Sequence, residues 1–292
     1  MEYTLSLGGI SAKVASLGAE LISLTDEKGR EFIWQGHPSG WTGRNPNLFP
    51  VIGAVKPYGI LYEGVAYPTP RHGFARHSEF ALVEKTDSSI TLELSDTPET
   101  LALYPYSFRL RISHRIAGRG FRTEYEVLNT GDKDMYYCVG GHTAFNCPLD
   151  AAEKFSDWKL VFEKGESKEA LLPLEGGFIS CNNSMDAIVD GRFIPLDHDL
   201  HDRIDTLIFD GLNSTSVKLQ GPRGDGVQMD FSGFPMIAFW TAPGKHAPYI
   251  CLEPWQGCGA LENEDGEFAH KHHAVNLAPG ESRILGYTVT IL

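Results

Sequence analysis

The chain lacks the features of several large protein classes. Its 292 residues include only 25 Lys and Arg against 38 Asp and Glu, for a formal net charge of −13. Nucleic-acid binders gain most of their affinity from clustered basic side chains, so DNA and RNA are not expected partners. The sequence has no apolar run of about 18 residues, and residues 1–15 lack the pattern of an export signal. We therefore expect a cytoplasmic protein with no membrane association.

Cysteine is scarce as well. The five cysteines form no CxxC pair, and an odd number suits reduced thiols inside a cell. Free cysteine behaves as a small buried hydrophobe, so we expect all five to fill the core. They are Cys138, Cys147, Cys181, Cys251 and Cys258.

Common catalytic motifs are missing too. There is no GxxxxGK[ST], no GxGxxG after a strand, no HExxH and no GxSxG. The run 270–273 (HKHH) contains possible metal ligands, but it follows several acidic residues in a polar stretch typical of a surface loop. We expect no metal there.

The periodicity that is present has a period of two, which indicates strands with one buried and one wet face. Turn-forming Gly, Pro, Asn and Asp separate these segments. Only one short helix is expected, with its cap and first turn in residues 96–99 and its end before Pro105. This pattern predicts an all-β protein, a large β-sandwich in a single domain over residues 1–292. The clearest expected strands are residues 3–7, 90–94, 108–112, 121–127, 227–231 and 287–291.

Four apolar or glycine-rich segments contain polar residues that suit chemistry. Glu253 lies between Leu252 and Pro254, where a carboxylate is costly to desolvate unless it is paired or has a task. His142 and His72 stand beside glycines, although a buried neutral histidine with satisfied nitrogens is also common. A carboxylate and an imidazole supply a base and an acid near neutral pH. The segments are 70–76 (PRHGFAR), 138–145 (CVGGHTAF), 204–209 (IDTLIF) and 249–257 (YICLEPWQG).

These segments, with 32–36 (FIWQG) and 46–53 (PNLFPVIG), resemble the aldose 1-epimerase or galactose-mutarotase-like family, most closely its bacterial LacX-like branch. The resemblance runs almost end to end, and its specific part is HGFAR followed by EPWxG. It implies a galactose-mutarotase-like β-supersandwich with few short helices. It also implies an isomerase that interconverts the α and β anomers of an aldohexose, with no metal or organic cofactor.

The resemblance assigns roles residue by residue. Glu253 matches the general base that removes the proton from the C1 hydroxyl, and His142 matches the general acid that protonates the ring oxygen. His72 matches a histidine that binds near C1 and the ring oxygen. Asp205 matches the residue that grips sugar hydroxyls; we prefer it to Asp202 and Asp210 because it stands just before the apolar run 207–209.

The arginine that helps to bind sugar in many relatives is missing, since Gly53 is followed by Ala54. Arg44, Lys56 or Arg71 are the possible replacements, and Arg71 is our first choice. Side chains of adjacent strand residues face opposite ways, so Arg71 shares a pocket with its neighbour His72 only if a loop or bulge carries both.

Arg76 and Trp255 are further predicted substrate-binding residues. Trp34, Trp240 and Trp255 offer possible stacking faces for a pyranose, although ordinary core packing explains Trp34 and Trp240 equally well. The expected partner is a small-molecule sugar, bound by a monomer or a homodimer.

Three other functions remain open. A hexose-phosphate 1-epimerase would need a cationic clamp from Arg44, Arg71 or Arg76, against which the overall negative charge argues. A non-catalytic carbohydrate-binding sandwich would use the same residues only as hydrogen-bond partners. A glycoside hydrolase or lyase would use Asp205 and Glu253 as a carboxylate pair. The leading interpretation requires that Glu253 and His142 face each other across one sugar-sized cavity.

Overall fold

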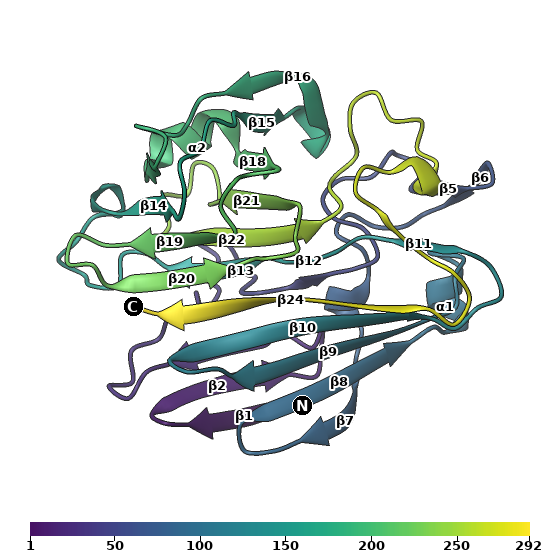
Figure 1. Ribbon diagram of the computed structural model, residues 1–292, viewed down its shortest axis with the longest axis horizontal. Helices are drawn as coiled ribbons and strands as arrows, with labels where there is room; N and C mark the ends of the chain where they lie inside the picture. Colours follow the sequence, from purple (N-terminus) through teal and green to yellow (C-terminus); the bar gives the residue numbers. More distant parts are fainter.

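Antiparallel strands dominate the computed structural model, which describes residues 1–292 (Figure 1). Two large sheets form a sandwich, and one cluster of 68 buried residues fills the space within it. The nine-stranded sheet has the spatial order β17 (Phe193–Pro195), β14 (Lys159–Phe162), β19 (Ser216–Gln220), β20 (Gly226–Asp230), β24 (Ser282–Ile291), β10 (Gly120–Asn129), β9 (Phe108–Ile116), β8 (Ser89–Ser95) and β7 (Ala81–Lys85).

The second large sheet has eight strands. In spatial order they are β16 (Ile179–Met185), β15 (Ala170–Pro173), β18 (Thr206–Asp210), β21 (Met236–Trp240), β22 (Tyr249–Gln256), then β12 (Val139–Gly141) with β13 (Thr143–Asn146), and β4 (Asn47–Leu48). Three small sheets complete the fold: β1 (Glu2–Leu7) with β2 (Ile10–Ala15) and β3 (Leu21–Thr25), β5 (Ile60–Tyr62) with β6 (Val65–Tyr67), and β11 (Met135–Tyr137) with β23 (Val275–Leu277).

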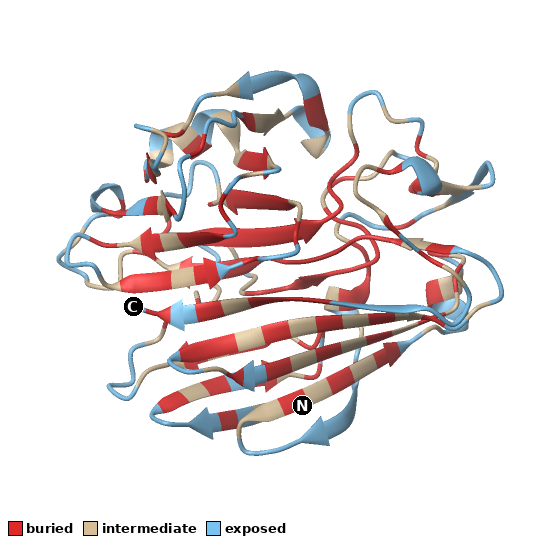
Figure 2. Ribbon diagram, in the orientation of Figure 1, coloured by how far each residue is buried: buried red, intermediate tan, exposed pale blue.

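The expected strands are confirmed, and the mostly β architecture with them. Burial alternates residue by residue along β9 and β10, as a sheet with one wet face requires (Figure 2). In contrast, β22 is buried along its whole length. A strand that is buried on both faces shows no alternation of apolar and polar residues, so the sequence pattern does not identify it.

The structure has two short α-helices, whereas the sequence analysis expected one. The expected helix is α1 (Pro98–Leu101), capped by the Thr97 side chain. A second helix, α2 (His198–Ile204), begins after the Asp197 cap, and its seven residues are too short to show a helical period. Neither helix has the length and apolar character that crossing a membrane requires. Single 3-10 turns occur at Ala75–His77, Phe155–Asp157, Glu175–Gly177 and Phe268–His270.

The prediction that all five cysteines fill the core is wrong for Cys181. Its side chain is exposed on β16, and its thiol lies 3.2 Å from the Asn263 Oδ1. β16 is the edge strand of the eight-stranded sheet, so nothing covers its outward face. The other four cysteines are buried as expected.

His114 is a fully buried histidine that couples stability to pH. Its Nδ1 lies 2.9 Å from Thr123 Oγ1 and its Nε2 lies 2.8 Å from the Ala19 carbonyl oxygen, so the neutral ring is satisfied. Burial lowers the pKa of His114 to about 4. The unfolded chain takes up this proton below about pH 6.5, whereas the folded chain does so only near the lower value.

We therefore expect the free energy of unfolding to fall as pH drops from about 6.5 to about 4, with a contribution from His114 of about 3 kcal/mol. Urea unfolding at several pH values in this window measures it. His114→Gln removes the titrating group, and its unfolding free energy should depend less steeply on pH than that of the parent. Equal slopes for the two proteins would contradict the assignment.

Candidate active site

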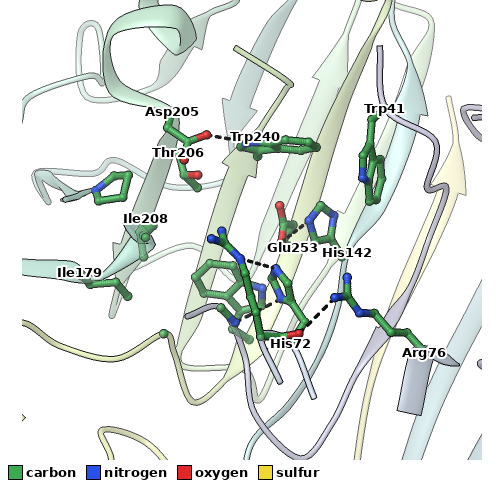
Figure 3. A pocket seen from close by; sticks show the side chains of 16 residues that line it. Trp41, His72, Arg76, His142, Ile179, Asp205, Thr206, Ile208, Trp240 and Glu253 are labelled. Atoms are coloured by element: carbon green, nitrogen blue, oxygen red, sulfur yellow. Dashed lines mark hydrogen bonds and ion pairs between the residues drawn. The ribbon is translucent and has the colours of Figure 1, made fainter. Parts of the chain in front are cut away.

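A cavity of about 370 Å³ opens on the eight-stranded sheet, and all residues that the sequence analysis assigned to catalysis or sugar binding line it (Figure 3). The volume suits a small ligand such as a monosaccharide. The lining residues are Trp41, Gly53, Arg71, His72, Arg76, His142, Pro173, Gly177, Ile179, Asp205, Thr206, Ile208, Trp240, Glu253, Trp255 and Gly259.

Strand register explains why His142 and Glu253 meet. β22 pairs with β12 at Gly140↔Trp255 and with β13 at Thr143↔Leu252, so the same register runs through the break between these two strands. That register places His142 opposite Glu253. Directly opposed residues of antiparallel strands have their Cβ atoms about 5 Å apart, which lets the two side chains touch.

The two side chains lie next to each other on one wall of the cavity, and this corrects the expectation that they face each other across it (Figure 3). His142 Nε2 is 3.4 Å from Glu253 Oε2, and the side chains are 9% and 2% exposed. Both residues still line the same cavity. A sugar in the cavity therefore meets both groups from one side.

Burial shifts the two groups in opposite directions. It raises the pKa of Glu253 well above its ordinary value, because a desolvated carboxylate resists ionisation, while the positive charge of Arg71 opposes this shift. It lowers the pKa of His142, because a desolvated imidazole resists protonation. Both shifts favour the pair of uncharged groups, in which the shared proton is on Glu253.

Aromatic rings hold the His142 imidazole in place. Trp41 stacks on it with ring centroids 4.8 Å apart, and the Trp240 ring meets it edge-on at 5.5 Å. The sequence analysis did not identify Trp41, and its only signal was the high aromatic content of the loop-rich region after Trp34. Trp34 itself stacks on Tyr249 at 5.0 Å and does not line the cavity.

A tight loop delivers Arg71 and His72 to the same cavity. His72 and Gly73 both have left-handed backbone, with φ of 62° and 72°. An added Cβ on Gly73 would stand 2.0 Å from the Phe49 carbonyl oxygen, so only glycine fits there. In an extended strand the side chains of Arg71 and His72 would point to opposite faces. The loop lets both enter the same cavity, which is the condition that the sequence analysis set for Arg71.

His72 is held as a neutral ring. The Gly53 N–H donates to its Nδ1 at 3.2 Å, and the Arg71 Nε lies 3.5 Å from its Nε2, so a backbone donor and a guanidinium donor both point at the ring. Burial lowers the pKa of His72 well below its ordinary value, and the neighbouring His142 adds to the effect. The ring centroids of these two histidines are 5.6 Å apart, so His72 lies beside the His142–Glu253 contact.

Asp205 enters the cavity from the end of α2, the helix missed from the sequence. It adopts φ 65°, a strained value for a residue other than glycine, and its Oδ1 accepts a 2.7 Å hydrogen bond from Trp240 Nε1. The two alternatives lie elsewhere: Asp202 binds His246, and Asp210 binds two histidines near the C-terminus. The structure thus brings only Asp205 of the three to the cavity.

Two arginines line the cavity without a carboxylate partner. Neither Arg71 nor Arg76 belongs to an ion pair, and the buried Arg76 Nε has no hydrogen-bond partner. Arg76 Nη2 donates to the Arg71 carbonyl oxygen at 3.1 Å. Burial and then the charge of Arg71 lower the pKa of Arg76. The two guanidinium groups lie at the same end of the cavity.

Arg44 and Lys56, the other two candidates for the missing sugar-binding arginine, bind backbone oxygens outside the cavity. Arg44 Nε donates to the Gln35 carbonyl oxygen at 2.9 Å. Lys56 Nζ lies 3.3 Å from the carbonyl oxygens of Leu261 and Glu262. Of the three candidates for the missing sugar-binding arginine, only Arg71 reaches the cavity.

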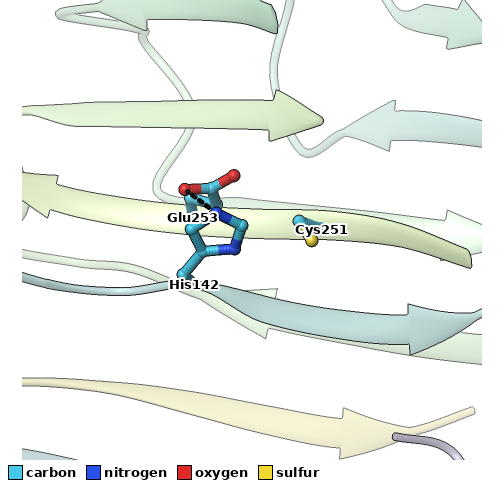
Figure 4. Close-up of side chains that lie close together, drawn as sticks. All are labelled: His142, Cys251 and Glu253. Atoms are coloured by element: carbon cyan, nitrogen blue, oxygen red, sulfur yellow. Dashed lines mark ion pairs between the residues drawn. The ribbon is translucent and has the colours of Figure 1, made fainter. Parts of the chain in front are cut away.

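Cys251 lies beside the pair, so the site contains three kinds of potential metal ligand (Figure 4). Burial and the neighbouring Glu253 raise the pKa of the Cys251 thiol well above its ordinary value. The thiolate is the form that binds metals, so this cluster is better suited to proton exchange than to metal coordination.

The comparisons with known proteins agree with this geometry. The family model described as Aldose 1-epimerase matches residues 1–285. The chain is 33% identical over 291 residues to the plasmid-borne protein LacX of Lactococcus lactis, covering 97% of each chain. A galactose mutarotase related enzyme from Lactobacillus acidophilus superposes with a TM-score of 0.93 at 30% identity, over 100% of this chain and 97% of that one. A galactose mutarotase-like protein from Lactobacillus casei gives 0.93 at 28% identity, over the whole of both chains.

The loop at His72 yields a test of the site's architecture. Gly73→Ala should destabilise the protein by roughly 1–3 kcal/mol or more, because the new methyl group combines left-handed strain with a clash at Phe49. Gly64→Ala is the matched control, since Gly64 has a similar φ of 76° but nothing within 4 Å of an added Cβ. Chemical unfolding of both variants is the measurement. Equal stability of the two would show that the close approach at Phe49 does not constrain the loop.

Proposed function

Because the chain belongs to the aldose 1-epimerase family, we propose that it interconverts the α and β anomers of an aldohexose. The observation that carries this proposal is the buried contact of 3.4 Å between His142 and Glu253 on the wall of a sugar-sized cavity. An acid and a base side by side can serve the two oxygens bonded to one anomeric carbon.

The reaction follows from this placement. Glu253 removes the proton from the C1 hydroxyl while His142 gives a proton to the ring oxygen, so that the C1–O5 bond breaks and C1 becomes an aldehyde. Rotation about C1–C2 presents the other face of the aldehyde. The ring oxygen then attacks C1 and returns its proton to His142, and Glu253 returns its proton to O1. The protein ends each cycle with the protons it began with.

The electrostatics support a shared proton. Ring opening converts a carboxylate and an imidazolium into a neutral acid and a neutral imidazole. Burial favours the neutral pair by raising the pKa of Glu253 and lowering the pKa of His142, whereas Arg71 favours the carboxylate. Proton exchange with the sugar is most efficient when neither form dominates strongly.

The neighbouring groups suit sugar binding. His72 places a neutral imidazole in the cavity beside His142, and Asp205 keeps a second carboxylate oxygen beyond the one that accepts from Trp240. Trp240 and Trp255 line the cavity with aromatic surface. We propose that these four residues position the ring and its hydroxyls.

We expect Glu253→Gln and His142→Asn each to lower the rate of anomer interconversion by a factor of about 100 or more, because each removes one partner of the proton exchange. Polarimetry of freshly dissolved α-D-glucose and α-D-galactose measures the rate. His246→Gln is the control, because His246 contacts Asp202 at 2.8 Å but is exposed and lies outside the cavity. Sugar binding without any acceleration by the parent protein would favour a non-catalytic carbohydrate-binding role.

A second candidate, a hexose phosphate as substrate, is favoured by the two arginines at one end of the cavity. Their guanidinium groups have no carboxylate partner, and the unpaired Nε of Arg76 is a buried donor. The Arg71 guanidinium packs against Gly177, where an added Cβ would stand 2.7 Å from its Nη1. A phosphate is the kind of group that two such donors bind well, despite the net negative charge of the whole chain.

If the substrate is phosphorylated, Arg71→Gln and Arg76→Gln should raise the KM for glucose 6-phosphate about 10–100-fold and change the KM for glucose much less, since each loses a charge-assisted hydrogen bond. Arg44→Gln, outside the cavity, should alter neither. Steady-state polarimetry with both sugars gives the ratio. A parallel rise for both sugars would assign the arginines to binding of the neutral ring.

A further inference from the structure

Three side chains outside the cavity converge at the end of β18. Asp210 is the last residue of β18, and His272 and His273 follow the 3-10 turn Phe268–His270. His272 Nε2 is 2.7 Å from Asp210 Oδ2, and His273 Nε2 is 3.0 Å from Asp210 Oδ1. One ligand-type atom from each residue lies within 4.8 Å of the others.

The backbone prepares this convergence. Neighbours in an extended chain point in opposite directions, but His273 adopts φ 55°, and the two imidazole centroids lie only 3.9 Å apart. The Gln256 side-chain amide, from β22, donates to the His273 carbonyl oxygen at 2.6 Å. Asp210 is paired with Met236 in the eight-stranded sheet. Both halves of the cluster are therefore anchored to the same sheet.

Lys271 explains why this segment is not the solvated loop that the sequence suggested. Its side chain is buried and lies 3.3 Å from Glu264. Burial of Lys271 draws the segment onto the protein, and the histidines that follow turn toward Asp210. His270, by contrast, stays exposed and contacts only Asp265 of its own segment.

The donor set fits a divalent transition metal. Two imidazole nitrogens and one carboxylate oxygen form a combination that binds Zn²⁺ and similar ions. Each Asp210 carboxylate oxygen faces one imidazole Nε2, so the three side chains already point toward a common centre. The three side chains are 30–39% exposed, which leaves room for water to complete the coordination.

We propose that Asp210, His272 and His273 form a binding site for a divalent transition metal ion such as Zn²⁺. The ion takes the place of the two N–H protons that now lie between the rings and the carboxylate. The bound ion would link the segment that carries His272 and His273 to the end of β18. None of the three ligands lines the cavity, so the site is separate from the proposed anomer chemistry and does not depend on it.

The ion would nevertheless bind close to the cavity. Thr206, Ile208 and Asp210 are alternate residues of β18 and share one face of the strand, and the first two line the cavity. Gly259, which lies in the segment that the ion would fix, also lines it. The site is therefore placed to stabilise one border of the cavity.

Calorimetric titration of the full chain, stripped of metal, with zinc chloride tests the proposal. We expect one saturable site, and at least about tenfold weaker binding in His272→Gln, His273→Gln and Asp210→Asn. His270→Gln and His246→Gln are matched controls, because each alters an exposed histidine that contacts one carboxylate. Both controls should retain the parent affinity.

Thermal unfolding gives an independent measurement on the same proteins. Zn²⁺ should raise the Tm of the parent and of His270→Gln but not that of His272→Gln or His273→Gln, since only the intact cluster binds the ion in the folded state. No saturable binding by the parent protein would overturn the proposal. Equal losses in His270→Gln and His272→Gln would also overturn it, because binding would then reside elsewhere in the segment.

Discussion

The site depends on one contact, that between His142 and Glu253 inside the protein. An imidazole and a carboxylate 3.4 Å apart, both almost fully buried, have pKa values shifted from those in water, and the proposed proton exchange rests on these shifts. The contact exists because the register of β12 and β13 against β22 sets the two residues opposite each other. It is buried because β22 and β12 are both buried along their whole length.

The rest of the cavity comes from loops and element ends under backbone strain. His72 and Asp205 both have left-handed φ values that residues other than glycine seldom adopt, and both line the cavity. His273, in the proposed metal cluster, shares this feature. Such conformations cost of order 1–3 kcal/mol each and persist only where the surroundings enforce them. Here the surroundings are a glycine turn, a helix end and a bound side-chain amide.

Local charge departs from overall charge. The chain as a whole is strongly acidic, with a formal net charge of −13, yet one end of the cavity holds two guanidinium groups without carboxylate partners. At the distances within a cavity, the nearest charges outweigh the distant surface charges, which solvent and salt screen. The total charge therefore says little about whether the ligand of this cavity is neutral or anionic.

The sequence by itself determined the β class and pointed to residues such as Glu253 and His142, which line the cavity. Period-two burial marks strands such as β9 and β10 because one face of their sheet is wet, and Glu253 stands out because a carboxylate in an apolar segment needs a reason. The helix α2 and the place of Trp41 escaped this reasoning, since a short polar helix has no clear period and a loop tryptophan has no fixed direction. Only the tertiary structure decided that Arg71 reaches the cavity while Arg44 does not, and that Asp210 joins two histidines 62 and 63 residues further on. Those contacts depend on register, left-handed turns and strand order, which arise from long-range pairing that a local pattern does not encode.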